Sequence, residues 1–149
     1  MKKQNEYTLQ KKICEYIRHQ YPNVLFLTDT VAAIRLTPMQ GKRNKDVQKE
    51  GFKTPDLLIL EPNRNYAGLL IELKIESPFY KGQFIELKSN EHIKEQANSL
   101  FELNIKGYYA CFAWSFEMAK AIIDDYMRGI IIRAVHTHLF YEYYCNIKN

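Results

Sequence analysis

Two neighbouring runs decide the fold: TPDLLIL (residues 54–60) and GLLIELKIE (residues 68–76). Both have the length and apolar composition of buried β-strands. Pro55 suits the start of a strand because it cannot donate a ladder hydrogen bond, and the polar residues 62–65, PNRN, have the composition of a turn. Residues 56–60 and 68–75 are therefore predicted to pair as a β-hairpin.

The second strand carries charge inside an apolar run. Side chains alternate between the two faces of a strand, so Glu72 and Lys74 share one face while Ile71 and Leu73 share the other. A strand this apolar is expected to be central, and a buried charge is costly unless it is paired or bound to a metal. Two explanations follow: a structural Glu72–Lys74 ion pair, or a functional site.

Asp56 favours the functional explanation. It begins the preceding strand, and the turn allows the two strands to pair so that the carboxylates of Asp56 and Glu72 converge. The alternative is that Asp56 is an ordinary turn residue after proline. Two carboxylates beside a lysine can hold Mg²⁺ or Mn²⁺ and activate a water for phosphodiester hydrolysis.

The rest of the chain alternates between helical and strand patterns. Residues 7–20 have helical spacing, residues 24–27 form a short strand, and residues 37–52 are predicted to be a polar, basic loop. Ser89 is expected to cap a helix that ends at Gly107, with an inward stripe of Ile93, Ala97, Leu100 and Leu103.

Three further elements complete the pattern. Residues 108–114 form a buried strand, Ser115 caps a helix that ends at residues 128–129, and residues 130–145 form one or two more strands. In the last helix the residues predicted to face inward are Met118, Ala121 and Ile122. Without an internal repeat or linker, residues 1–149 are expected to form a single α/β domain.

Composition gives weaker constraints. The net charge of +4 is compatible with nucleic acid without requiring it. The dispersed Cys14, Cys111 and Cys145 favour free thiols in a reducing compartment. The absence of a signal peptide and of an apolar span of about 20 residues predicts a soluble, cytoplasmic protein without a membrane partner. The four histidines, His19, His92, His136 and His138, show no spacing typical of metal ligands.

The hairpin segments resemble the signature of the PD-(D/E)XK nucleases, and more closely that of their VRR-NUC branch. The similarity extends to NEYTLQ (residues 5–10) and to HIKEQANSLFELNIKGYYACFAWSFEMAKAIIDDYMRG (residues 92–129), and so covers about Glu6 to Gly129. A long spacer between Lys74 and Gln96 departs from the pattern. The resemblance implies a restriction-endonuclease-like core, in which helices flank a mixed central sheet.

The resemblance also implies roles for individual residues. Asp56, Glu72 and the backbone carbonyl of Leu73 would bind the metal, and Lys74 would be the catalytic lysine. Gln96 would support the water or a phosphate; the alternative is a solvated helix residue. Glu6 would be the acidic metal ligand of the first helix, with Glu15 as the alternative.

The implied function is a Mg²⁺- or Mn²⁺-dependent endonuclease of phage type. It would cut DNA, with junctions and flaps as candidate structures, and would leave 5′-phosphate and 3′-hydroxyl ends. RNA is not excluded as a substrate. The alternatives are a binding module with the same fold that does not cleave, and an α/β protein whose charges are structural. The basic residues Lys42, Arg43 and Lys45 are expected to contact phosphates and become ordered on DNA, unless they form a solvated loop.

A homodimer is expected because one metal site cuts one strand, and symmetric cutting needs two sites. The aromatic residues of the tail offer an interface, unless they pack on the sheet edge: Phe140, Tyr141, Tyr143 and Tyr144.

Overall fold

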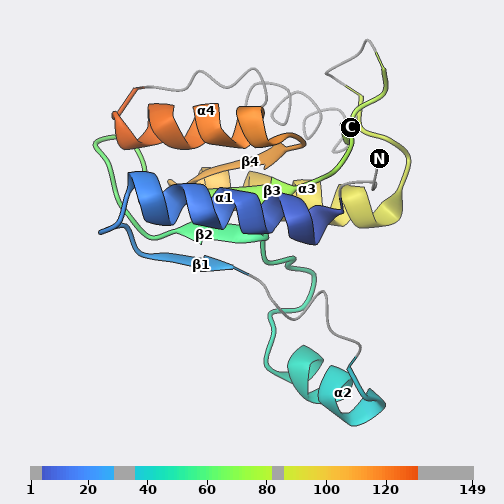
Figure 1. Cartoon of the computed structure of the whole chain (residues 1–149). Coiled ribbons are helices and arrows are strands. Elements are labelled where there is room, and N and C mark those ends of the chain that lie inside the picture. The colour runs from blue at the N-terminus through green and yellow to red at the C-terminus, as the bar shows by residue number, and fades with distance from the viewer. Residues whose placement is uncertain (1–4, 29–35, 82–85, 131–149) are drawn as a thin grey trace.

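The computed structural model describes residues 5–28, 36–81 and 86–130 of the 149-residue chain. Four helices and four strands occur in these ranges (Figure 1). In chain order they are α1 (Glu6–Gln20), β1 (Phe26–Thr28), α2 (Pro38–Asp46), β2 (Leu57–Ile59), β3 (Leu69–Leu73), α3 (Glu91–Ile105), β4 (Tyr109–Ala113) and α4 (Phe116–Met127).

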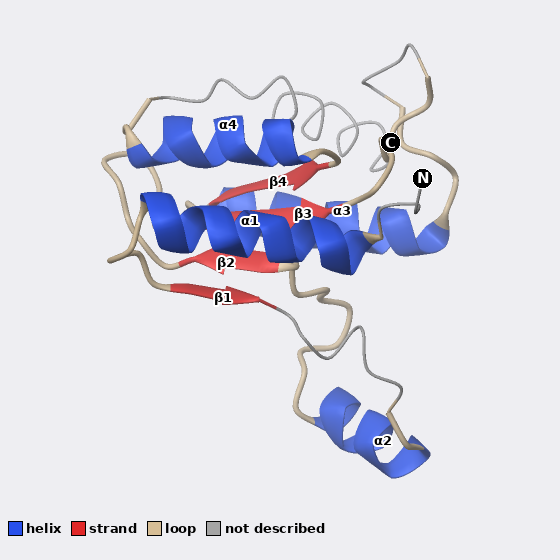
Figure 2. Ribbon diagram, viewed as in Figure 1, coloured by secondary structure: helices blue, strands red, loops and turns tan. Residues whose placement is uncertain are grey.

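The strands form one mixed sheet in the order β1-β2-β3-β4 (Figure 2). The first three are antiparallel neighbours, and β3 pairs with β4 in parallel. Leu57 lies opposite Ile71, and Ile59 lies opposite Leu69. The predicted hairpin is therefore confirmed, and β3 is flanked by a strand on each side, as its apolar sequence requires.

Helices cover both faces of the sheet (Figures 1 and 2). On one face, α1 and α4 pack against the side chains of Leu69, Ile71 and Leu73. On the other face, α3 packs through Ala97, Leu100 and Leu103, together with Leu70 of β3. Alternation along β3 thus divides the core into two, and the side chain of Glu72 falls on the α3 face.

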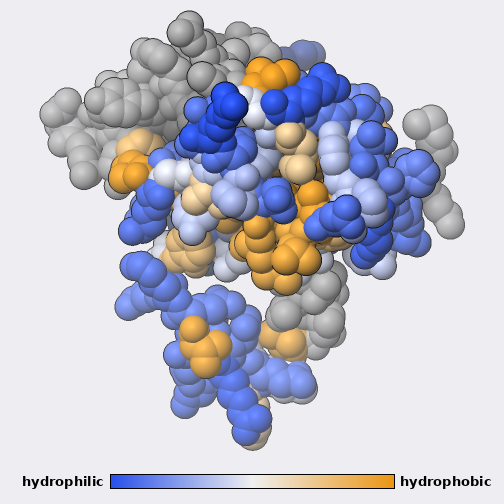
Figure 3. All heavy atoms as spheres, turned by 90° about the vertical axis from the view of Figure 1, so that its left-hand side faces the viewer, coloured by the Kyte–Doolittle hydropathy of each residue, from blue (hydrophilic) through white to orange (hydrophobic). Residues whose placement is uncertain are grey.

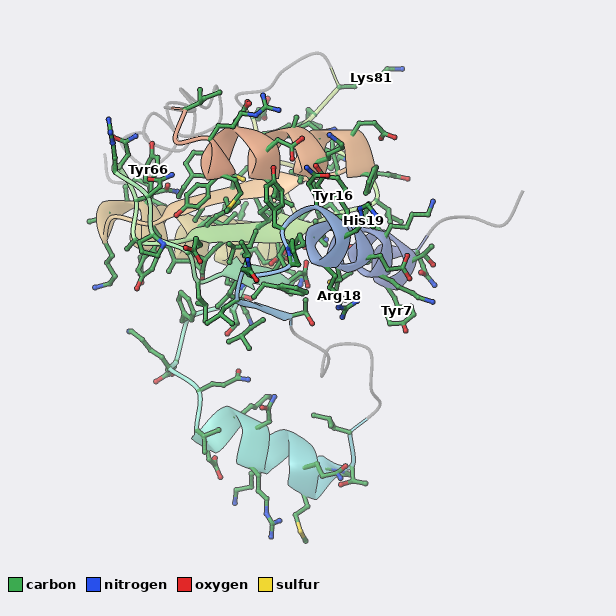
Figure 4. The ribbon with its side chains drawn as sticks, turned by 60° about the vertical axis from the view of Figure 1, so that its left-hand side comes forward. Tyr7, Tyr16, Arg18, His19, Tyr66 and Lys81 are labelled. Carbon is green, nitrogen blue, oxygen red and sulfur yellow. The ribbon has the colours of Figure 1, made fainter. Side chains whose placement is uncertain are left out.

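The buried carboxylate of Asp124 connects α1 to α4 through hydrogen bonds. Tyr16 and Tyr21 donate their hydroxyls to Oδ1 of Asp124 at 2.5 and 2.8 Å, and Lys120 Nζ lies 2.7 Å from Oδ2. Figure 4 shows Tyr16 on the α4 side of α1, whereas Arg18 is drawn on the opposite side. This network fixes the helical layer that covers one face of the sheet.

The segment predicted to be a loop, residues 37–52, contains the helix α2, so that prediction is wrong. Thr37 accepts a hydrogen bond from the backbone of Gln40, the Gln40 side chain accepts one from the backbone of Thr37, and Pro38 occupies the first turn. This is a capping box with proline where a helix tolerates it best. The residues Lys42, Arg43 and Lys45 therefore lie on a helix.

Two details of the other helices also differ from expectation. Asn90, not Ser89, caps α3, because its side chain accepts from the backbone N–H groups of residues 92 and 93. In α4, Ser115 is the cap as predicted, and Ile122 is buried. Ala121 is exposed, however, and the inward positions beside Ile122 are Ala119 and Ile123.

The predicted α/β fold class, a mixed sheet with flanking helices, is confirmed. Cys14 and Cys111 are buried free thiols. No helix in the described ranges is long and apolar enough to cross a membrane. Residues 131–145 of the predicted tail strands, including Phe140, Tyr141, Tyr143 and Tyr144, lie outside the described residues.

Candidate active site

Asp56 and Glu72 meet where the hairpin opens. The β2–β3 register, extended by one residue, sets Asp56 opposite Glu72. The backbone N–H of Leu73 donates to Oδ2 of Asp56 at 2.8 Å, and the side chain of Gln10 donates to the Asp56 carbonyl at 3.1 Å. Asp56 is thus held from both β3 and α1, with its carboxylate turned toward the end of β3.

Glu72 is buried, with 3% of its surface exposed. Its Oε1 accepts from Lys74 Nζ at 2.8 Å and from the side-chain amide of Gln96. Burial, together with the negative charge of Asp56, raises the pKa of Glu72 to about 7, although Lys74 opposes this shift. The lysine therefore does not compensate fully for burying Glu72 beside the half-buried carboxylate of Asp56.

Lys74 also connects the site to the first helix. Its Nζ lies 3.9 Å from Oε1 of Glu6, which is on the first turn of α1. Glu15, the alternative acid, instead pairs with Lys11 at 3.9 Å. Of the two, the structure brings Glu6 toward Glu72 and Lys74.

Gln96 is buried on the sheet side of α3, so the alternative of a solvated helix residue is wrong. While its amide nitrogen donates to Glu72, its buried Oε1 has no hydrogen-bond partner among the described residues. An unpaired buried carbonyl is costly. A water, a metal-bound water or another donor in the site would satisfy it.

The carboxylates face a cavity of about 290 Å³. Its lining comes from separate parts of the chain: Leu36, Asn44, Gln48, Phe52, Lys53, Thr54, Asp56, Glu72, His92 and Gln96. Sequence reasoning missed Asn44, Gln48 and His92. His92 could have been found, because it precedes Gln96 by one helical turn and so shares its face.

The predicted basic cluster lies nearby on α2 but not in this cavity. Lys42, Arg43 and Lys45 are exposed, and none of them lines it. Between them, Asn44 is half-buried and does line it. The helix therefore presents an amide to the site and cations to its surroundings.

The donors at the site fit a hard divalent cation. Among the described residues, no group of three His, Cys, Asp or Glu side chains is placed to hold a metal without further ligands. Mg²⁺, however, is commonly bound through one or two carboxylates and keeps several waters. Asp56 and Glu72 offer two carboxylates in one cavity, and the unpartnered Oε1 of Gln96 could accept from such a water.

A larger cavity, of about 530 Å³, lies between α1 and the start of α4. It contains Glu15 and His19 but none of Asp56, Glu72, Lys74 or Gln96. Its acidic lining includes Glu117 as well as Glu15, and the two carboxylates are contributed by different helices. Because Asp56, Glu72 and Gln96 line the smaller cavity and not this one, the smaller cavity is the candidate active site.

Comparison with known proteins finds a likeness among solved structures. No family model matches the chain, and no curated protein matches it. A solved structure named "VRR_NUC domain protein" aligns with 87% of this chain and 93% of its own, at 20% sequence identity and a TM-score of 0.55. At this identity the likeness establishes a shared fold.

Proposed function

We propose that this chain is a metal-dependent endonuclease that hydrolyses phosphodiester bonds in DNA. The observation that carries the proposal is the meeting of Asp56 and Glu72 in one cavity, with Lys74 and Gln96 hydrogen-bonded to Glu72. The fold shared with the VRR_NUC domain protein and the sequence resemblance to that nuclease branch both support it.

Asp56, Glu72 and the carbonyl of Leu73 would hold the cation. A bound Mg²⁺ or Mn²⁺ neutralises phosphate charge and lowers the pKa of a bound water. The exposed first-turn Glu6 would contribute from the side of α1, through a water or directly. Asp56 is already oriented for this by the N–H of Leu73.

Lys74 would act on the reacting groups. Its side chain is only 13% exposed, and its ammonium lies beside Glu72, from where it can orient the attacking water and stabilise charge on the scissile phosphate. Gln96 would orient the same water through its Oε1, which accepts no hydrogen bond from the described residues. The chain thus provides cation ligands, a charged donor and an orienting acceptor on one side of the cavity.

The structural alternative is that Glu72 and Lys74 are only an ion pair. The pair does exist, at 2.8 Å. Burial and the negative charge of Asp56 raise the pKa of Glu72, and Lys74 opposes this shift. The second carboxylate, that of Asp56, lies in the same cavity and favours a site that is completed by a cation.

A cleavage panel tests the proposal. Duplex, single-stranded, flapped and four-way-junction DNA, with matched RNA, would be incubated with Mg²⁺, Mn²⁺ or EDTA. The proposal expects cleavage that depends on the cation and is lost in Asp56→Asn. Binding without cleavage in every reaction would favour the alternative, a non-cleaving nucleic-acid-binding module.

We also propose that the working unit is a homodimer, because the described residues of the chain form one such site and cutting two strands symmetrically needs two. Sedimentation at micromolar concentration, with and without junction DNA, tests this. A strictly monomeric species in both conditions would contradict it and leave the nuclease proposal in place.

A further inference from the structure

We infer that Asn44, Gln48 and His92 form a nucleotide subsite that holds the residue next to the cleaved phosphodiester. The inference deepens the proposed function and rests on it, since it assigns the cavity wall that faces the proposed cation ligands. Sequence reasoning placed none of the three in the site.

The first observation is the character of α2. No residue of this helix is buried, and those that are half-buried are Gly41 and Asn44, three positions apart. A helix in a globular protein usually packs through an apolar stripe. Figure 3 shows α2, at the bottom of the view, as mostly hydrophilic. Packing through an apolar stripe therefore does not explain why Asn44 is half-buried.

The second observation is where that face leads. Asn44 and Gln48, four residues apart, line the same cavity as Asp56 and Glu72. An atom added at Gly41 would meet nothing within 4 Å, so the space beside this face of α2 is open. The side chains of Asn44 and Gln48 thus border the open space of the site.

His92 completes the wall from α3. It lies one turn before Gln96, and the side chain of Asn90 fixes its backbone N–H at 2.9 Å. His92 is exposed, and its imidazole can donate a ring N–H, so its position suits hydrogen bonding to a phosphate or sugar.

The chemistry of the lining identifies the class of ligand. Apart from Asp56 and Glu72, none of the lining residues is acidic, and Asn44, Gln48 and His92 all carry hydrogen-bond donors. Lys53 is assigned no role, because its Nζ pairs with Glu95 at 3.3 Å. A ligand that contacts both the proposed cation ligands and these hydrogen-bond donors would be a phosphate ester that carries further polar groups. A nucleotide fits this description.

Binding of thymidine 3′,5′-bisphosphate in the presence of Ca²⁺, measured by calorimetry, tests the subsite without requiring hydrolysis. The variants are Asn44→Ala/Gln48→Ala and His92→Ala. His19→Ala is the control, because His19 lines the other cavity. Loss of a hydrogen bond to a charged group typically weakens binding by about tenfold or more. We expect such a loss for both variants and none for the control.

The inference is overturned if the wild-type protein does not bind the bisphosphate, or if both variants bind it within about twofold of the wild type. Circular dichroism and thermal unfolding would show that the variants fold. If the variants lose the bisphosphate but no nucleic acid is cut by the wild type, the subsite stands and the nuclease proposal fails. If cleavage occurs and the variants bind normally, only the subsite fails.

Discussion

Asp56 stands across the β2–β3 pair from Glu72, and its negative charge adds to burial in raising the pKa of Glu72 from 4.5 to about 7. Two carboxylates are therefore held together before any cation is bound. The ammonium of Lys74, 2.8 Å from Glu72, opposes the shift without cancelling it, so holding the two carboxylates together lowers stability where both are ionised. The consequence can be measured without knowing the substrate.

Stability should therefore depend on pH through Glu72. Between pH 4.5 and about 7 the folded protein keeps this proton and the unfolded chain releases it. The free energy of unfolding due to Glu72 consequently falls as pH rises through that window. The free energy of unfolding should be measured by urea for the wild type and Glu72→Gln at pH 5 and pH 8, in EDTA. It should fall less between pH 5 and pH 8 in the variant than in the wild type. An equal loss in both proteins would contradict the burial argument.

Lys74 is expected to act in the chemical step. Lys74→Met should lower the cleavage rate by about 10²–10⁴-fold at saturating Mn²⁺ while the Mn²⁺ midpoint changes little. Lys88→Met is the matched control, because Lys88 pairs with Glu76 at 4.0 Å on the surface. An unchanged rate in Lys74→Met would make this lysine a structural partner of Glu72.

The exposed cations of α2 are predicted to contact phosphates. Replacing Lys42, Arg43 and Lys45 with alanine should weaken DNA binding and make it less sensitive to salt, by up to about 0.9 in the logarithmic slope for each lost contact. The control is the double variant Lys106→Ala/Arg128→Ala, which removes two exposed positive charges that follow α3 and α4. A salt slope in the triple variant equal to that of the wild type would show that α2 is simply solvated.

Asp124 should stabilise the fold rather than the site. Burial raises the pKa of Asp124, but hydrogen bonds from Lys120, Tyr16 and Tyr21 outweigh this effect and hold the pKa below 3.8. Its contribution is present above the unfolded-state pKa and is lost as pH falls through the folded-state pKa. Tyr21→Phe should cost about 1 kcal/mol, whereas the exposed Tyr7→Phe should cost little. Equal unfolding midpoints for the two variants would contradict this role.

The sequence allowed the hairpin and the two faces of β3 to be predicted because the period of a strand is local. Alternation of Ile71, Glu72 and Leu73 specifies which side chains share a face. It also predicts that Glu72 and Lys74 point together, and the structure shows their side chains hydrogen-bonded. Their catalytic roles remain predictions.

Helix α2 was missed because its composition is that of a loop. Its polar residues and Gly41 are typical of a loop, but the first turn stabilises a helix, because Thr37 and Gln40 form a capping box. That signal is visible in the sequence as TPMQ (residues 37–40). In α4 the inward positions of Met118 and Ile122 are confirmed and that of Ala121 is wrong, since Ala121 and Ala119 are chemically equal and only packing distinguishes them.

The cavity wall could not be predicted from spacing. Asn44 and Gln48 reach the site only through the tertiary arrangement that brings them to the same cavity as Asp56. Only the relation between His92 and Gln96 is local, because one helical turn separates them. Local patterns therefore located the carboxylates and the lysine but not the side chains that face them.

The central claim is that Asp56 and Glu72 together hold a catalytic cation. The most direct test is the single-turnover cleavage rate as a function of Mn²⁺ concentration for the wild type, Asp56→Asn and Glu72→Gln, with Glu15→Gln as control. The account predicts saturable, cation-dependent cleavage by the wild type and the control, and no cleavage by either site variant. Cleavage by Asp56→Asn at the wild-type rate and with the wild-type Mn²⁺ midpoint would contradict it.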